Sequence, residues 1–236
     1  MAARRRGLLG TVADFLVEPS ATLDEAPETA WSGAARPVIA VAGLGARSGV
    51  TTVARALGAE LSLRDPEGAA VVTSGAIAGG GIPLGTAAAG RLAQALSRSV
   101  HARTRAVGRV CLAETAIDDQ ALVETARGLA PLVLDVAEPS QTARAAAVSD
   151  AVVLLGLPDV EPALATVLSD SLRRVGPEPV VVLNRDLGCS ERWEGSPALR
   201  LPDSRLGAQL ALAGREPRGE LGRAIARLAD MVAGQP

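Results

Sequence analysis

The sequence is most informative in what it lacks. Its 236 residues include no lysine, so all 24 basic residues are arginine, and they include no tyrosine. A GC-rich genome is the commonest cause of such a bias, but no role that needs a lysine amine can be filled from within this chain. The only aromatic residues are Phe15, Trp31 and Trp193. The core must therefore consist of aliphatic side chains and alanine, and base-stacking surfaces for nucleic acid are not expected.

The sequence contains few residues that could bind a metal ion or act as a thiol nucleophile. Cys111 and Cys189 are far apart in the sequence, and His101 is the only histidine. No zinc-type cluster or Cys/His nucleophile pair follows from this spacing, so both cysteines are expected to be small buried residues in a reducing cytoplasm. No apolar run approaches the roughly 20 residues of a membrane-spanning helix. The net charge of −2, without a long basic tract, predicts no specific nucleic-acid partner.

Residues 1–17 are predicted to form an amphipathic helix. Three arginines at positions 4–6 precede an apolar stripe, which consists of Leu8, Val12, Phe15 and Leu16. Residues 18–36 are rich in Pro, Ala, Glu, Ser and Thr, which is typical of a flexible linker. The helix could dock on a partner protein, on an anionic membrane surface or on its own domain. The length of the linker favours the first two.

Residues 37–236 are predicted to form one α/β domain. Apolar strands are expected at 38–42, 69–73, 107–112, 132–136, 151–155 and 180–183. Helices are expected at 51–61, 86–96, 118–129, 204–213 and 220–233, with one more whose core face consists of Leu164, Val167, Leu168, Leu172 and Val175. This alternation predicts a mostly parallel sheet flanked by helices on both faces. A ligand would bind at the carboxyl ends of the strands.

The segment from Gly43 to Thr52 lies between the first predicted strand and the first predicted helix. Glycines and small residues there would let backbone N–H groups form an anion-binding nest at the helix N-terminus. Thr51 and Thr52 stand where a hydroxyl could hold Mg²⁺. The alternative is a glycine-rich turn that only links a strand to a helix.

Five short segments, in order, decide between these alternatives. They are the loop with Gly49, Thr51 and Thr52, the strand that ends near Asp135, the segment Ser149–Leu154, the segment Val180–Arg185, and Leu201–Asp203 with the helix after it. Over residues 37–233 the chain thereby resembles the ParA/MinD branch of P-loop NTPases. The resemblance implies a homodimer in the cytoplasm, with a peripheral position at the inner membrane face if the N-terminal helix binds lipid.

The resemblance also implies a site for ATP or ADP with Mg²⁺. Asp135 would act in catalysis and would hold the metal together with Thr51. The remaining candidate ligand-binding residues are Gly45, Arg47, Ser48, Gly49, Val50 and Thr52 around the phosphates, and Asn184, Arg185 and Asp203 around the base. Simpler alternatives are a helix cap for Asp135, an Asx turn for Asn184, and a surface ion pair for Arg185 and Asp203.

The loop departs from the family pattern at its two lysines. Val50 stands where the loop lysine belongs, and Gly45 stands where the signature lysine of this branch belongs. Arg47 could neutralise a phosphate, whereas Arg55 is expected to be solvated. Because phosphoryl transfer depends on positioning and charge, ATPase activity is predicted to be weak or absent. Three hypotheses follow: a nucleotide-responsive regulatory or positioning protein, a pseudo-NTPase that acts only through protein interactions, and an active partitioning ATPase.

Overall fold

The structure is a computed structural model that describes residues 36–74, 85–100, 102–117, 120–188, 191–193 and 197–233. The predicted N-terminal helix and most of the linker therefore lie outside the described residues. The same holds for His101 and Cys189. The helix predicted from residue 118 is described from Gln120.

One eight-stranded sheet forms the centre of the domain, in the order β3-β4-β2-β5-β1-β6-β7-β8. All neighbouring strands are parallel except β3 and β4. The strands are β1 (Val38–Gly43), β2 (Ala69–Thr73), β3 (Arg103–Val107), β4 (Val110–Glu114), β5 (Leu132–Val136), β6 (Ala151–Gly156), β7 (Pro179–Asp186) and β8 (Leu199–Pro202). The predicted mostly parallel sheet is confirmed.

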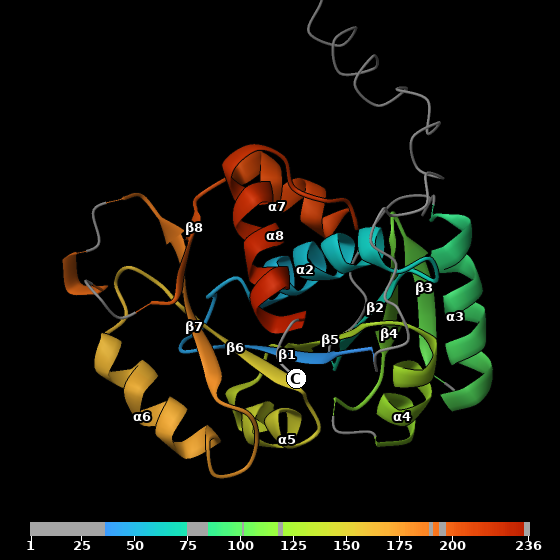
Figure 1. Cartoon of the computed structure of the whole chain (residues 1–236), viewed down its shortest axis with the longest axis horizontal. Helices are drawn as coiled ribbons and strands as arrows, with labels where there is room; N and C mark the ends of the chain where they lie inside the picture. Colours follow the sequence, from blue (N-terminus) through green and yellow to red (C-terminus); the bar gives the residue numbers. More distant parts are fainter. Residues whose placement is uncertain are drawn as a thin grey trace, which may run out of the picture.

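Helices cover both faces of this sheet (Figure 1). One face carries α2 (Val50–Arg64), α7 (Arg205–Leu212) and α8 (Gly219–Ala233), and the other carries α3 (Ala87–Val100), α4 (Gln120–Leu129), α5 (Thr142–Ala147) and α6 (Pro162–Leu172). Side chains of β1 alternate between the two resulting cores, with Ile39 in one and Val38 in the other. This alternation is the period-2 geometry of a strand buried on both faces.

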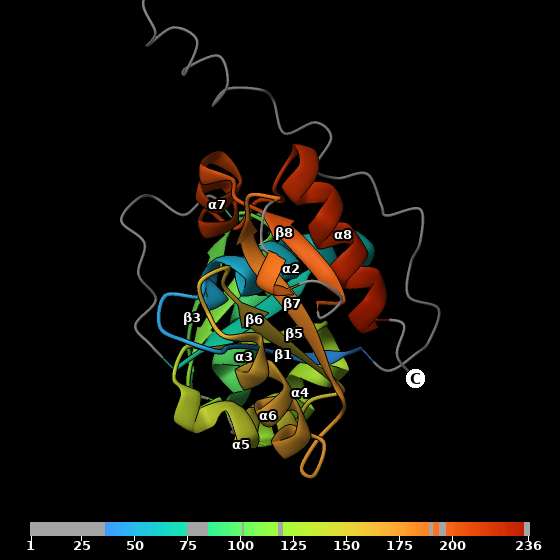
Figure 2. The same ribbon diagram turned by 90° about the vertical axis from the view of Figure 1, so that its left-hand side faces the viewer.

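Helix α2 lies between the sheet and the helices α7 and α8. Helix α8 lies beside β8 (Figure 2). Helix α2 is therefore buried nearly all around, including its charged residue Arg55. No helix in the described part of the chain is long and apolar enough to cross a membrane.

The strand predicted at 107–112 exists as β4, but its predicted bounds are wrong. It begins at Val110 and ends at Glu114, and it is the second strand of a hairpin in which β3 pairs antiparallel with β4 and the chain turns at Gly108, whose φ is +55°. Strand β3 was missed because it is polar, starting Arg103-Thr104-Arg105, and lies at the edge of the sheet. Charged side chains are typical of edge strands, since they discourage pairing with another chain.

The predicted core face of α6 is also wrong in part. Its buried residues are Ala165, Ser169 and Leu172, whereas Leu164 and Val167 are 51% and 68% exposed. Val175, just after the helix, is 48% exposed. The helix is apolar on most of its surface, so periodicity alone could not identify the buried side.

The boundaries of two segments differ from the predicted ones. Arg36, expected at the end of the linker, donates from Nε to Oδ2 of the buried Asp65 at 2.7 Å, so its side chain belongs to the folded domain. Strand β7 continues through Asn184 and Arg185 to Asp186 instead of ending before them.

Candidate functional site

The loop between β1 and α2 has the backbone conformation of an anion-binding turn. Gly49 precedes the helix with φ +86° and ψ +20°, and Arg47 has φ +58°. A left-handed conformation is uncommon for an arginine and marks a turn held by its surroundings. A Cβ at Gly43 would lie 1.9 Å from Oγ of the buried Ser48, so any larger residue there would displace that side chain.

The backbone N–H groups of this loop are the next feature of the site. Among the described residues, no acceptor pairs with the backbone N–H of any residue from Gly45 to Thr52, and the first helical bond runs from Val53 N to Gly49 O at 3.0 Å. Such N–H groups at a helix N-terminus, with the positive end of the helix dipole, form a site suited to an anion.

Asn184 fastens this loop to β7. Its Nδ2 donates to Ser48 O at 2.8 Å, and its Oδ1 accepts from Arg185 N at 3.0 Å. A Cβ at Gly49 would lie 2.5 Å from Nδ2, so the close approach requires glycine. One described contact of Asn184 therefore holds the loop and the other lies within β7, while one Nδ2 hydrogen and one Oδ1 lone pair remain for a base.

Asp135 and Thr51, the candidate metal ligands, lie side by side. Thr51 Oγ1 donates to Asp135 Oδ1 at 3.2 Å. Asp135 is 2% exposed, and this burial raises the pKa of its carboxyl group, although the hydrogen bonds from Thr51 and Thr73 and the charge of Arg55 act in the opposite direction. Thr73, at the end of β2, was not recognised as part of the site.

Arg55 was expected to be solvated, and this is wrong. The residue is only 6% exposed, and its Nη1 donates to Leu212 O at the end of α7 at 3.0 Å. Burial lowers the pKa of its guanidinium, which the charge of Asp135 partly offsets. The site therefore contains one internal cation on the helix turn that follows Thr51. The enclosed position of α2, which sequence periodicity does not reveal, explains why it was missed.

The two positions at which the family pattern has a lysine differ in their surroundings. They are occupied by Val50 and Gly45. Val50 is 8% exposed and belongs to the apolar core beneath α2. A Cβ at Gly45 would meet nothing closer than Val160 Cγ2 at 3.8 Å, so the position has room for a side chain. Arg47 is exposed. Neither lysine position therefore supplies a positive charge to the loop.

Thr52, Asn184, Arg185 and Asp203 line one small cavity beside the loop. Its volume is about 40 Å³, whereas pockets for small molecules typically measure about 300–1,000 Å³. The structure thus brings these predicted residues together, but the space between them is too small for a base. Arg185, like Arg47, has a left-handed backbone, with φ +57°.

Trp193 supports the loop from the other side. It is fully buried, and a Cβ at Gly156 would lie 2.5 Å from its ring. Leu44 of the loop and Ala165 of α6 belong to the same apolar cluster. The indole Nε1 has no hydrogen-bond partner among the described residues.

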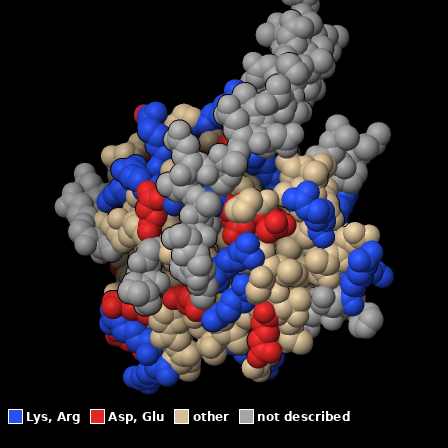
Figure 3. Space-filling view, turned by 45° about the vertical axis from the view of Figure 1, so that its right-hand side comes forward, with Lys and Arg blue, Asp and Glu red and all other residues tan. Residues whose placement is uncertain are grey.

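Charge on the molecular surface is mixed. On the face shown in Figure 3, arginines and acidic residues are interspersed without a large area of one sign. The described His, Cys, Asp and Glu side chains form no group of three that could hold a metal ion. Any Mg²⁺ at Asp135 and Thr51 would therefore take its other ligands from water and from phosphates, as is usual for this ion.

Comparison with known proteins identifies the fold. No protein-family profile matches the sequence, and no curated protein sequence matches it. A ParA family ATPase from Chlorobium tepidum TLS is similar in structure, with a TM-score of 0.59, 15% sequence identity, and coverage of 83% of this chain and 99% of that one. The septum site-determining protein MinD from Pyrococcus horikoshii OT3, complexed with Mg-ADP, has a TM-score of 0.58 at 16% identity, with coverage of 84% and 96%.

An enzyme of another kind is also similar. Cobyrinic acid a,c-diamide synthase from Mycobacterium smegmatis, with bound ATP analog and magnesium, has a TM-score of 0.53 at 16% identity, and 83% of this chain and 93% of that chain are covered. The fold thus serves more than one activity. The chain has the P-loop NTPase-like α/β fold of the ParA and MinD ATPases.

Proposed function

We propose that this protein is a nucleotide-responsive regulatory or positioning protein, similar to ParA and MinD, with weak or no ATPase activity. The observation that carries the proposal is that no described residue accepts a hydrogen bond from the backbone N–H groups of Gly45 to Thr52, which lie directly beside Asp135. Phosphates of ATP or ADP would bind to these N–H groups, and Mg²⁺ would bind between Thr51 and Asp135. Two proteins of the same fold contain a nucleotide with magnesium.

Weak catalysis follows from the charges around the loop. Hydrolysis requires cations that stabilise the charge developing on the transferred phosphoryl group. Val50 supplies none, and the guanidinium of Arg55 is engaged by Leu212 O. Arg47 is a planar, bulky cation, which is a poor replacement for a compact ammonium group.

A second candidate is a pseudo-NTPase that acts only through protein interactions. It is supported by the small size of the cavity at Asp203, which is about 40 Å³ and leaves no room for a base. In either case the protein would act as a homodimer and would bind a partner protein or an anionic membrane surface through residues 1–17.

Calorimetry with ADP and with a non-hydrolysable ATP analogue, each with and without Mg²⁺, tests the first candidate. We expect modest binding that strengthens with Mg²⁺ and loses this dependence in Asp135→Ala. Asp170→Ala, which removes an exposed carboxylate on α6, is the matched control. Absence of binding under all four conditions would favour the pseudo-NTPase. Brisk ATP hydrolysis that Asp135→Ala abolishes would show an active ATPase and contradict both candidates.

A further inference from the structure

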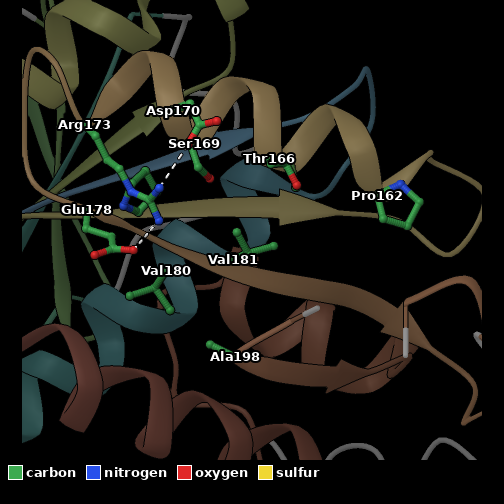
Figure 4. A pocket seen from close by; sticks show the side chains of 11 residues that line it. Pro162, Thr166, Ser169, Asp170, Arg173, Glu178, Val180, Val181 and Ala198 are labelled. Atoms are coloured by element: carbon green, nitrogen blue, oxygen red, sulfur yellow. Dashed lines mark hydrogen bonds and ion pairs between the residues drawn. The ribbon is translucent and has the colours of Figure 1, made fainter. Parts of the chain in front are cut away.

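A groove separate from the β1–α2 loop lies between α6 and β7 (Figure 4). Its volume is about 500 Å³, which is within the range of about 300–1,000 Å³ that binding sites usually have. Its floor is apolar, with Val180 and Val181 from β7 and Ala165 from α6. Thr166 lines it from the helix, and Ala198 lines it from the opposite side.

The groove contains a buried polar group without a partner. Ser169 is 7% exposed, and its Oγ has no hydrogen bond to any described residue. Figure 4 shows this oxygen directed from α6 toward the strands. Buried hydroxyl groups are nearly always hydrogen-bonded in folded proteins. A polar group that enters the groove would therefore supply the missing hydrogen-bond partner of Ser169.

The apolar floor of the groove could receive the apolar face of another helix. Leu164 and Val167, which are 51% and 68% exposed, lie on other sides of α6 and do not line the groove.

The charged residues that line the groove are slightly acidic in sum. They are the carboxylates of Asp170 and Glu178 and the guanidinium of Arg173, which pairs with both. The net charge of −1 that results favours a basic occupant.

Residues 1–17 have the matching chemistry. This segment carries Arg4, Arg5 and Arg6 against the single acidic residue Asp14. Its apolar residues follow a helical spacing, with Leu8, Val12, Phe15 and Leu16 on one face. Anchors at positions i, i+4, i+7 and i+8 are typical of a helix that binds in a groove.

The linker is long enough for this segment to reach the groove. Arg36 precedes β1, and parallel pairing of β1 with β6 and of β6 with β7 places Pro179 at the same end of the sheet. Two strand spacings separate β1 from β7, which is about 10 Å. A random chain of 18 residues has a root-mean-square end-to-end distance of about 24 Å.

We propose that residues 1–17 dock in the groove between α6 and β7 of their own chain. The apolar stripe contacts Val180, Val181 and Ala165, and the three arginines lie near Asp170 and Glu178. This contact does not depend on nucleotide. It has a regulatory consequence, because the docked stripe is not available to a membrane or a partner protein until it leaves the groove.

Cysteine labelling of the full-length chain tests this docking. The reporter is Thr166→Cys in a Cys189→Ser background, where the buried Cys111 remains unreactive. We expect a maleimide to react about tenfold more slowly than in the same protein with Phe15→Asp, which corresponds to about 1.4 kcal/mol of docking free energy. Ala13→Asp adds the same charge outside the apolar stripe and should keep the protection.

Two further reporters make the outcome decisive. Ala198→Cys probes the opposite side of the groove and should show the same protection, whereas Leu206→Cys, on an exposed site of α7, should react equally fast in every variant. Equal rates with and without Phe15→Asp at both groove reporters would overturn the proposal. So would protection that increases with protein concentration, since the segment would then come from a second copy.

Discussion

Val50 is the residue on which the proposed weakness of the loop chemistry depends most. We expect Val50→Lys to raise affinity for Mg-ATP by about tenfold or more, because a compact cation would enter a loop that now has none. The same change should lower the free energy of unfolding by about 1.5–3 kcal/mol, since a buried valine is lost from the core under α2. Calorimetry and urea unfolding measure the two effects.

Val50→Met is the control for this substitution. It extends the side chain by a similar length but adds no charge, so it should not raise affinity. An equal gain from both variants would show that shape, and not the missing charge, limits binding at this loop.

Arg55 is the internal cation next to Asp135. We expect Arg55→Met to lower the free energy of unfolding by about 1–3 kcal/mol, because Leu212 O loses its donor and the buried Asp135 loses a compensating charge. Mg²⁺ should then raise the melting temperature of this variant more than that of the parent. Arg91→Met, at an exposed site on α3, should respond to Mg²⁺ as the parent does. An identical response of Arg55→Met would contradict the assigned role.

The thiol of Cys111 is predicted to be unreactive in the folded protein. Burial raises the pKa of its thiol from an ordinary 9.0 to about 12. At pH 8 this reduces the thiolate fraction by roughly a thousandfold, so Ellman's reagent should react with a Cys189→Ser protein only after unfolding. The raised pKa also means that this group's contribution to stability is complete below pH 9.0 and is lost as the pH rises toward 12. Rapid reaction of the folded protein at pH 8 would show that Cys111 is accessible.

At the scale of the element, α6 provides a direct test of the observed packing. Leu172→Ala should lower the free energy of unfolding by about 2–5 kcal/mol, because Leu172 is fully buried. Val167→Ser, on the exposed surface, should change it by no more than about 0.5 kcal/mol. A large loss from Val167→Ser in chemical unfolding would mean that this surface is covered, either by residues 1–17 or by a second copy.

The same helix shows where prediction from sequence ends. Strands such as β2 and β5 were predicted with their observed bounds. A short apolar run between two turns is typical of a strand in a sheet that helices cover on both faces. The buried side of α6 was not predictable, since apolar residues occur on most of its surface. Strand β3 was missed because an edge strand needs no apolar pattern.

The candidate site was predictable to a similar extent. The loop and Asp135 follow from the order of elements, since parallel strands bring their carboxyl ends to one edge. The contact of Arg55 with Leu212 was not predictable, because the two residues are 157 positions apart in the sequence. Only the packing of α7 onto α2 brings them together.

At the scale of the whole molecule, the sheet connects two separate surfaces. The loop at Gly45–Thr52 follows the carboxyl end of β1, whereas the groove begins at Pro179, at the amino end of β7. A nucleotide and residues 1–17 could therefore bind at the same time without direct contact. Trp193 is the shared element, since its cluster contains Leu44 of the loop and Ala165 of the groove.

Binding to anionic vesicles should depend on residues 1–17. Each of Arg4, Arg5 and Arg6 near an acidic surface contributes about 1 kcal/mol, so replacing all three with Gln should weaken binding by roughly a hundredfold. Sedimentation with acidic vesicles at low and high salt measures this, and high salt should weaken binding of the parent. Gln at the exposed Arg174, Arg223 and Arg227 removes the same charge elsewhere and should have little effect. If both triple variants lose binding equally, the attraction comes from the overall charge of the protein, and residues 1–17 are not the anchor.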